Sequence, residues 1–192
     1  MTVKTRLLLL LALVGMVVLA VSCTGDTPAS SGAGTSTLPV VSLHGVDNKG
    51  AGPEAGMRAP NFVMTNADGS ISSLSDLRGQ PVVLNFWATW CPPCRAEMPD
   101  LVKAYETHKD SGLVIVGINE QDEEAKALAF MDQYGIEFPV ILDSRGDLAS
   151  LYAARGLPAT FFIDRNGNVV ETWSGMLTPD ILEERLQRLL EG

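Results

Sequence analysis

The chain has 192 residues, with 14 basic and 23 acidic side chains and a formal net charge of −9. This length allows one domain with extensions rather than two full domains. The acidic balance leaves no basic patch for phosphates, which disfavours nucleic-acid binding, and two distant histidines, His44 and His108, are too few for a histidine-rich metal site. The composition indicates a soluble, globular, acidic protein, and we expect no bound metal.

The chain begins with an unbroken apolar run over residues 7–21, preceded by two basic residues. A membrane-spanning helix needs about 20 apolar residues, whereas a signal-peptide core has about 7–15. Residues 1–22 are therefore interpreted as a signal peptide or membrane anchor. The junction at residues 20–23 (AVSC) resembles a bacterial lipobox, which would make Cys23 a lipidated first residue; an uncleaved anchor and simple secretion are the alternatives. Each of them places the folded part outside the cytoplasm.

The next segment, residues 23–57, is rich in Gly, Ser, Thr, Pro and Ala and poor in large apolar side chains. Such a composition buries too little surface to offset the entropy lost on ordering, so we predict a flexible linker. Lipidation of Cys23 would also leave two of the three cysteines to act together.

Residues 58–192 alternate short β-branched runs with helical periodicity, which predicts an α/β domain. The expected elements, in chain order, are a hairpin over residues 62–72 turning at Asp68-Gly69, a strand over 82–87, a helix from about 93, a strand over 114–118, a helix around 127–134, a strand over 140–142, a short helix over 147–153, a hairpin of strands 160–163 and 169–170, and a terminal helix capped by Thr178 with Pro179 at its first position. Two parallel crossovers followed by an antiparallel hairpin indicate a mixed central sheet flanked by helices.

The strongest signal for chemistry is the pair Cys91 and Cys94, separated by two prolines at the junction of a predicted strand and helix. One helical turn of spacing brings two sulfurs close enough to bridge. Free N–H groups and the helix dipole face the first sulfur, and such cysteines have pKa values lowered from about 8.5 to between about 3.5 and 7.5. We expect Cys91 to attack as a thiolate and Cys94 to resolve the mixed disulfide. An inert disulfide would stabilise little across so short a loop, and no second cysteine pair completes a metal site.

Two segments carry a family resemblance: residues 83–99 (VLNFWATWCPPCRAEMP) and residues 156–160 (GLPAT). They closely resemble the TlpA/ResA-like branch of the thioredoxin family, whose members are membrane-tethered, extracytoplasmic thiol-disulfide oxidoreductases. The resemblance covers essentially residues 58–192. It implies a thioredoxin-like fold with an N-terminal β-hairpin and a central helix–strand insertion, here between about residues 122 and 142.

The resemblance also implies a substrate-binding surface around the cysteine pair. The proline at position 158 corresponds to one that is cis in the family, where the backbone before it binds an extended substrate. We therefore expect Trp90, Pro92, Pro93, Leu157 and Pro158 to contact substrate. Trp90 is interpreted as an apolar platform for a protein partner, and the other tryptophan of the motif is expected to pack beneath the site.

One departure from thioredoxin concerns the residue that deprotonates the resolving thiol. Asn85 stands where thioredoxin has a buried aspartate. Glu97 follows Cys94 by three residues and shares its helical face, and ResA-like proteins have a glutamate there that tunes the active-site thiols. We therefore assign Glu97 to the catalytic site.

The two prolines also indicate the direction of the reaction. Neither Pro92 nor Pro93 can donate an N–H to the thiolate, so the disulfide is stable relative to the dithiol and the reduction potential is low. We predict a reductant of exported proteins, for example of an apocytochrome c, with no cofactor besides the Cys91–Cys94 disulfide. By resemblance, a membrane protein supplies the electrons, and we expect the protein to be a monomer.

Two alternative functions remain open at this stage. A peroxiredoxin-like peroxidase resembles the chain at residues 59–62, but its pattern requires threonine and proline where this sequence has Ala88 and Leu84. A copper-binding assembly protein of the Sco type requires CxxxC and a downstream histidine, and no histidine follows His108.

Overall fold

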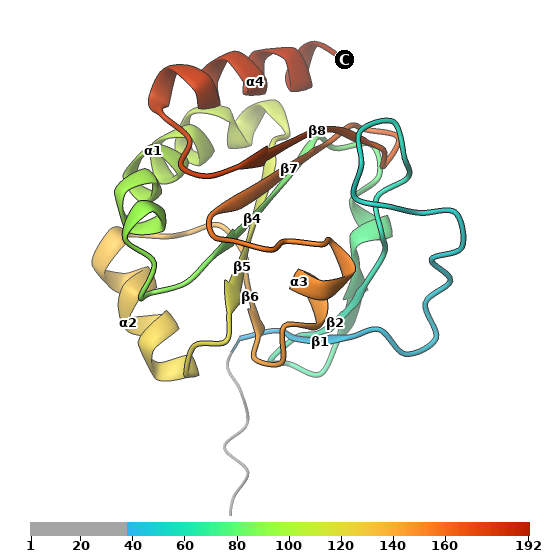
Figure 1. Ribbon diagram of the computed structural model, residues 1–192, viewed down its shortest axis with the longest axis horizontal. Coiled ribbons are helices and arrows are strands. Elements are labelled where there is room, and N and C mark those ends of the chain that lie inside the picture. The colour runs from blue at the N-terminus through green and yellow to red at the C-terminus, as the bar shows by residue number, and fades with distance from the viewer. Residues whose placement is uncertain (1–37) are drawn as a thin grey trace, which may run out of the picture. The chain divides into compact units, whose positions relative to one another are not determined.

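An eight-stranded mixed sheet organises the structure, a computed structural model that describes residues 38–192 (Figure 1). The elements are β1 (Val40–Ser42), β2 (Val63–Thr65), β3 (Ile71–Ser73), η2 (Leu74–Leu77), β4 (Val82–Trp87), α1 (Pro92–His108), η3 (Lys109–Ser111), β5 (Val114–Glu120), α2 (Glu124–Tyr134), β6 (Val140–Asp143), α3 (Asp147–Leu151), β7 (Ala159–Ile163), β8 (Val169–Ser174) and α4 (Pro179–Glu191). Across the sheet the strands run in the order β3-β2-β1-β6-β5-β4-β7-β8.

The centre of the sheet has the expected connections. β4 pairs in parallel with β5 and β5 with β6, so α1 and α2 are the two crossover helices. β7 runs antiparallel to β4 and continues into β8 through a turn that contains Gly167, whose φ is +85°. The thioredoxin-like α/β fold, with its helix–strand insertion of α2 and β6, is confirmed.

Alternating side chains of β4 supply both faces of the sheet with core residues. Val83 and Trp87 point to the face covered by α1, α2 and α4, whereas Leu84 and Phe86 point to the face covered by α3 and η2 (Figure 1). Every residue of β4 is buried. Burial on both faces accounts for the nearly continuous apolar character of this strand.

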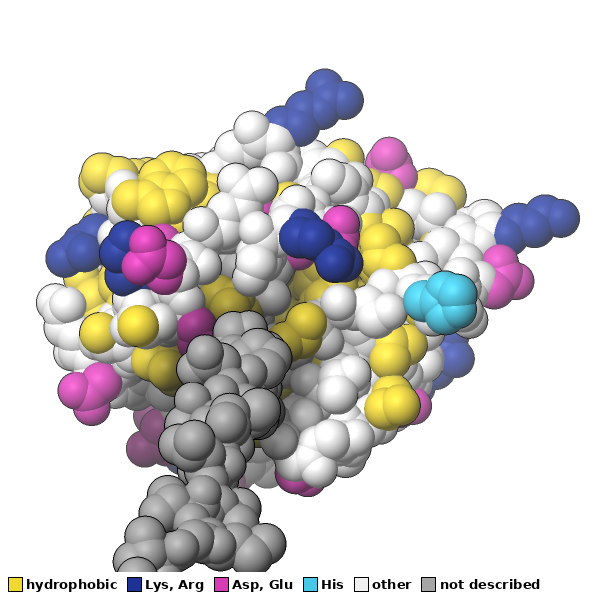
Figure 2. All heavy atoms as spheres, turned by 90° about the horizontal axis from the view of Figure 1, so that it is seen from below, with side chains coloured by type: hydrophobic (Ala, Val, Ile, Leu, Met, Phe, Trp, Pro, Cys, Tyr) yellow, Lys and Arg dark blue, Asp and Glu magenta, His cyan; other side chains and the backbone are white. Residues whose placement is uncertain are grey.

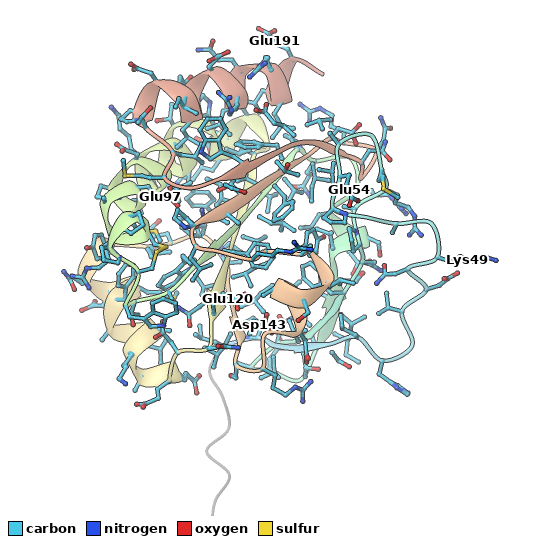
Figure 3. The ribbon with its side chains drawn as sticks, viewed as in Figure 1. Lys49, Glu54, Glu97, Glu120, Asp143 and Glu191 are labelled. Atoms are coloured by element: carbon cyan, nitrogen blue, oxygen red, sulfur yellow. A yellow bond between two sulfur atoms is a disulfide. The ribbon has the colours of Figure 1, made fainter. Side chains whose placement is uncertain are left out.

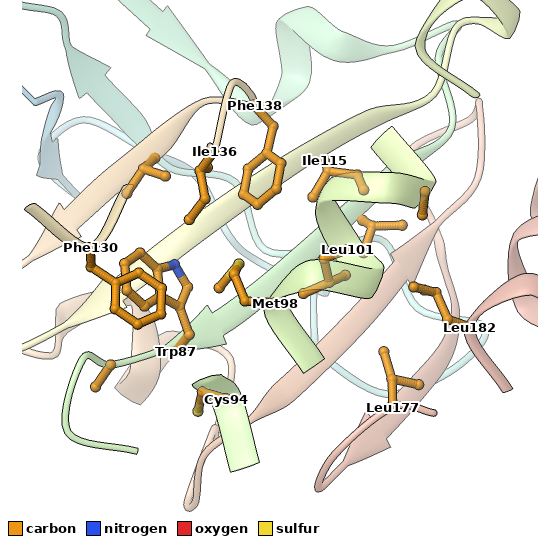
Figure 4. Close-up of a cluster of buried hydrophobic side chains, with 14 of the residues drawn as sticks. Trp87, Cys94, Met98, Leu101, Ile115, Phe130, Ile136, Phe138, Leu177 and Leu182 are labelled. Carbon is orange, nitrogen blue, oxygen red and sulfur yellow. The ribbon is translucent and has the colours of Figure 1, made fainter. Parts of the chain in front are cut away.

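Trp87 packs at the centre of the larger cluster, as expected, between Phe130 of α2 and Met98 of α1 (Figure 4). Its indole nitrogen lies over Gly117 of β5, where an added Cβ would stand only 2.9 Å from it. The small residue on the neighbouring strand therefore lets the indole lie flat under the active-site end of α1.

The prediction of a flexible linker is wrong for residues 38–57, the part of that segment that the structure describes. β1 pairs antiparallel with β2 and parallel with β6, and so joins the N-terminal hairpin to the rest of the sheet. Asn48 then exchanges two hydrogen bonds with the backbone of Asn61, at 2.9 and 2.7 Å, and the N–H of Gly56 bonds the carbonyl of Val169. A three-residue strand has too little periodicity to be visible in the sequence, and its stability comes from partners distant in the chain. Residues 1–22 and Cys23 lie outside the described residues.

The hairpin predicted at residues 62–72 is confirmed as the antiparallel pair β2 and β3.

The predicted capping of the terminal helix by Thr178 is only partly right. Thr178 is the N-cap residue of α4 and Pro179 takes the first helical position, yet the Thr178 side chain makes no capping hydrogen bond. Its carbonyl instead accepts the N–H of Leu182 at 2.9 Å.

Basic side chains do not gather on the face shown in Figure 2. Most Lys and Arg side chains on this face stand apart, two lie together at its left, and acidic and apolar side chains are interspersed among them. In this part of the chain no helix is long and apolar enough to cross a membrane.

Candidate active site

The two cysteines lie where the central strand β4 turns into α1. Cys91 is the N-cap residue of α1, and Pro92 and Pro93 occupy the first two helical positions, where no intrahelical N–H is needed. Of the first three helical residues only Cys94 has an N–H, and it donates to Sγ of Cys91 at 3.3 Å. The two sulfurs are joined in a disulfide, with the Cα atoms 5.3 Å apart.

Both cysteines are buried, but they differ in whether they line a groove. Cys94 is fully buried against Met98 and Trp87, whereas Cys91 keeps 3 % of its surface exposed (Figure 4). Cys91 nevertheless lines an open groove of about 860 Å³, which we call the front groove. Of these two cysteines, Cys91 is therefore the one that faces a molecule bound in the front groove.

The front groove runs between the start of α1 and the segment before β7. It is lined by Trp90, Cys91, Pro92, Pro93, Glu120, Gln121, Arg145, Gly146, Ala149, Ser150, Ala153, Ala154, Arg155, Gly156 and Leu157. Trp90 is 63 % exposed, which makes it the largest exposed aromatic surface beside the cysteines. The sequence-predicted residues Trp90, Pro92, Pro93 and Leu157 therefore share one groove with Cys91.

Pro158 lies on the other side of that segment. The Leu157–Pro158 bond is cis, as the resemblance implies, and Pro158 lines a second groove of about 620 Å³. Its carbonyl accepts the N–H of Gly175 at 2.9 Å. Gly156 and Leu157, by contrast, make no backbone hydrogen bond within residues 38–192, so their N–H and C=O groups are free to pair with an extended chain.

Behind the disulfide, Glu97 is buried rather than solvated, with 1 % of its surface exposed. One carboxylate oxygen accepts the side-chain amide N–H of Asn85 at 2.9 Å, and the other accepts the N–H of Leu177 at 2.8 Å. Asn85 also donates to Thr160 at 3.1 Å. Burial raises the pKa of Glu97 to about 7, and the two hydrogen bonds limit the rise. A group of this kind can hold or release a proton near neutral pH.

A second network, which the sequence reasoning missed, holds the loop before Cys91. Asp122 accepts the backbone N–H of Thr89 at 2.7 Å and its hydroxyl at 2.8 Å, and also the side-chain amide of Asn119 at 2.8 Å. Arg95 donates to the carbonyl of Thr89 from the other side. The position of Asp122, just after the strand neighbouring β4, was the available signal, since parallel strands end at the same edge of a sheet.

A third group missed by the sequence reasoning is a pair of acidic residues at the ends of β5 and β6. Glu120 and Asp143 face each other as direct neighbours in the parallel register, and Figure 3 places them together beside α3. Both are buried. Burial, and then the neighbouring Asp143 carboxylate, raise the pKa of Glu120 to about 8.

Known proteins resemble this arrangement in sequence and in fold. The AhpC/TSA family model matches residues 55–172. The thiol-disulfide oxidoreductase ResA of Bacillus thuringiensis subsp. konkukian is 38 % identical over 136 residues, which are 71 % of this chain and 79 % of that protein. ResA of Bacillus subtilis is 37 % identical over 137 residues, 71 % of this chain and 76 % of that protein.

Among solved structures, a thiol:disulfide interchange protein of the thioredoxin family from Chlorobium tepidum superposes with a TM-score of 0.62 at 31 % identity. The match covers 69 % of this chain and 95 % of that protein. The family model spans the strands from β2 to β7 and includes both cysteines.

Proposed function

Because the chain belongs to the ResA/TlpA-like family of thioredoxin-fold thiol-disulfide oxidoreductases, we propose that it reduces disulfides of exported proteins through Cys91 and Cys94. The observation that carries this proposal is the position of the pair: one sulfur lines a groove at a helix N-terminus, and the other is buried one turn behind it.

The reaction has two exchanges. The Cys91 thiolate attacks one sulfur of the substrate disulfide, forming a mixed disulfide and releasing the other substrate sulfur as a thiolate, which takes a proton. The Cys94 thiol then loses its proton and attacks Cys91, which releases the second substrate thiol and closes the Cys91–Cys94 disulfide. Two electrons pass from the protein to the substrate.

Glu97 is proposed to take the proton of Cys94. It lies three residues farther along α1 on the same helical face, and its pKa of about 7 suits a group that gains and loses protons near neutral pH. The side-chain amide of Asn85 and the N–H of Leu177 each donate a hydrogen bond to one oxygen of Glu97. These bonds stabilise the carboxylate form of Glu97, which is the form that accepts a proton.

The reductive direction rests on the two prolines. Cys91 receives one backbone N–H, from Cys94, where a helix start without prolines could offer more. A less stabilised thiolate favours the disulfide, so the protein gives electrons away readily.

The test combines kinetics with a redox titration. The pre-reduced protein is mixed with a disulfide-bridged peptide, and C91S should abolish the reaction while C94S should stop it at a mixed disulfide visible by mass spectrometry. Equilibration with glutathione buffers should give a reduction potential well below about −120 mV, the value of a strong oxidase. A potential near that value would contradict the reductive role.

We further propose that the domain is tethered outside the cytoplasm through a lipidated Cys23 and receives electrons from a membrane thiol donor. The support is the AVSC junction after the apolar run. Radioactive palmitate should label the full-length protein in bacterial cells, and C23S should lose both the label and the membrane fraction. Retention of C23S in the membrane would favour an uncleaved anchor.

The AhpC/TSA match favours one second candidate, a peroxidase. The positions that a peroxide-binding pattern would fill with threonine and proline are Ala88 and Leu84, both buried and apolar. Reduced protein should therefore consume hydrogen peroxide no faster than a free dithiol does. Faster consumption would make the peroxidase the better assignment.

A further inference from the structure

Glu120 is a buried acidic residue of the front groove that the two exchanges do not use. It is the last residue of β5, is 6 % exposed, and lines the groove together with Cys91 and Leu157. Neither of its carboxyl oxygens has a hydrogen-bond donor within residues 38–192, and Oε1 is shut off from solvent as well. A carboxyl buried in this way without donors is costly unless something supplies the missing hydrogen bonds.

Asp143 can supply one of them. Its own carboxylate accepts three backbone N–H groups at the start of α3, from Asp147, Leu148 and Ala149, at 2.8 to 3.0 Å, so it remains an acceptor. Glu120 beside it can bond to it only by carrying a proton and donating that proton to Asp143. Of the basic residues lining the same groove, Arg145 is paired with Asp147, and no ion pair joins Arg145 or Arg155 to Glu120 in the described chain. Glu120 is thus held as a neutral acid.

A neutral acid has one oxygen left as an acceptor. Oε2 lies 3.9 Å from where a Cβ on Gly146 would stand, and Gly146 also lines the front groove, so this oxygen lies on the groove side. Much of the groove wall nearby is apolar, formed by Ala149, Ala153 and Leu157. A peptide chain lying against such a wall must find acceptors for the N–H groups that it removes from water.

We propose that Glu120 is a specificity-determining residue whose Oε2 accepts a backbone N–H of the protein substrate in the front groove. The inference rests on the proposed function, since it assumes that a peptide disulfide occupies this groove. Glu120 touches neither sulfur in the described contacts, so it selects substrates by their backbone and leaves the exchange itself unchanged.

The experiment compares two disulfides of different chemistry. One is a short disulfide-bridged peptide, and the other is bis(2-hydroxyethyl) disulfide, which has no amide N–H. Pre-reduced protein is mixed with an excess of either one in a stopped-flow instrument, and the dependence of the rate on concentration gives KM and the maximal rate. E120L removes the acceptor, whereas E120Q keeps one oxygen as an acceptor and offers Asp143 an N–H in place of the proton.

We expect E120L to raise KM for the peptide about fivefold to tenfold, the effect of losing one neutral hydrogen bond, with little change in the maximal rate. E120Q should retain nearly the original KM, and bis(2-hydroxyethyl) disulfide should react equally with all three proteins. The matched control is E137L, because the Glu137 side chain is 72 % exposed and lies outside the front groove.

Three results would overturn the proposal: an unchanged peptide KM in E120L, an equal loss for both disulfides, or an equal loss in E120L and E120Q. If E120L does not fold, E120M keeps the side-chain length without a carboxyl acceptor and takes its place. Failure of the proposed function looks different, because the unmodified protein would then reduce neither disulfide.

Discussion

The disulfide has a buried glutamate on each side, and the two differ in what surrounds them. Behind it, Glu97 has a donor on each oxygen, from Asn85 and Leu177. In front, Glu120 faces the Asp143 carboxylate and has no donor in the described chain. Burial raises the pKa of both, to about 7 behind and about 8 in front. The two carboxyls differ in what surrounds them: hydrogen-bond donors limit the rise in the pKa of Glu97, whereas a second carboxylate adds to the rise in the pKa of Glu120.

The largest expected effect is on the rate of the first attack, which should depend on Cys91 and not on Cys94. Only Cys91 reaches the front groove, so C91S should lower the rate of attack on a peptide disulfide by more than about 1000-fold, because a hydroxyl does not replace a thiolate as the nucleophile. C94S should retain the first attack and accumulate one mixed disulfide per protein, measured by mass spectrometry of the quenched reaction. An equal loss of first attack in both variants would show that the buried sulfur is also an attacker.

The two tryptophans beside the disulfide should contribute very differently to the stability of the fold. Trp87 is fully buried behind the disulfide, whereas Trp90 lines the front groove and is 63 % exposed. W87A should lower the free energy of unfolding by about 3–5 kcal/mol, and W90A should change it by less than about 0.5 kcal/mol. Urea unfolding of the oxidised proteins measures both, and a large loss in W90A would mean that this side chain supports the fold rather than the substrate surface.

A third prediction concerns the pH dependence of stability. Both carboxyls have a higher pKa in the folded protein than the ordinary value of 4.5, so the folded state binds more protons between the two values. The free energy of unfolding should therefore fall as pH rises from about 4.5 to about 8, by on the order of 3 kcal/mol for Glu97 and at most about 5 kcal/mol for Glu120.

Substitution of each glutamate separates its contribution to the pH dependence of the free energy of unfolding. E97Q should flatten the part of the curve that ends near pH 7, and E120Q the part that extends to about pH 8. Urea unfolding of the oxidised proteins at pH 5, 6, 7, 8 and 9 tests this. A curve in E97Q and E120Q as steep as that of the unmodified protein would show that the two carboxyls are ionised throughout.

The smallest expected effect is kinetic. E97Q keeps the size of the glutamate side chain, replaces one of its two acceptor oxygens by an amide donor and cannot take the proton of Cys94, so the second exchange should slow about tenfold to a hundredfold at neutral pH. The first attack by Cys91 should keep its rate. Reduced protein is mixed rapidly with the peptide disulfide and quenched with acid at successive times, so that mass spectrometry follows the mixed disulfide as it forms and decays. E137L is the control that should leave both rates unchanged.

The active-site side of the molecule was largely predictable from the chain. The strand at residues 82–87, the helix behind it and the cysteine spacing are local patterns, and each was confirmed. The burial of Trp87 and the cis bond before Pro158 were also confirmed. The N-terminal boundary was wrong, because β1 has three residues and is held by partners more than 20 residues away.

The sequence by itself determined the chemistry, since two cysteines one helical turn apart after a buried strand form a dithiol wherever that junction folds. Only the tertiary structure decided the proton affinities and the groove. Glu97, Glu120 and Asp143 are ordinary carboxylic acids in the chain, and Asp122 is a single residue between two elements. Their properties depend on burial and on neighbours from other strands and helices, and such distances exist only once the sheet has brought its strands together.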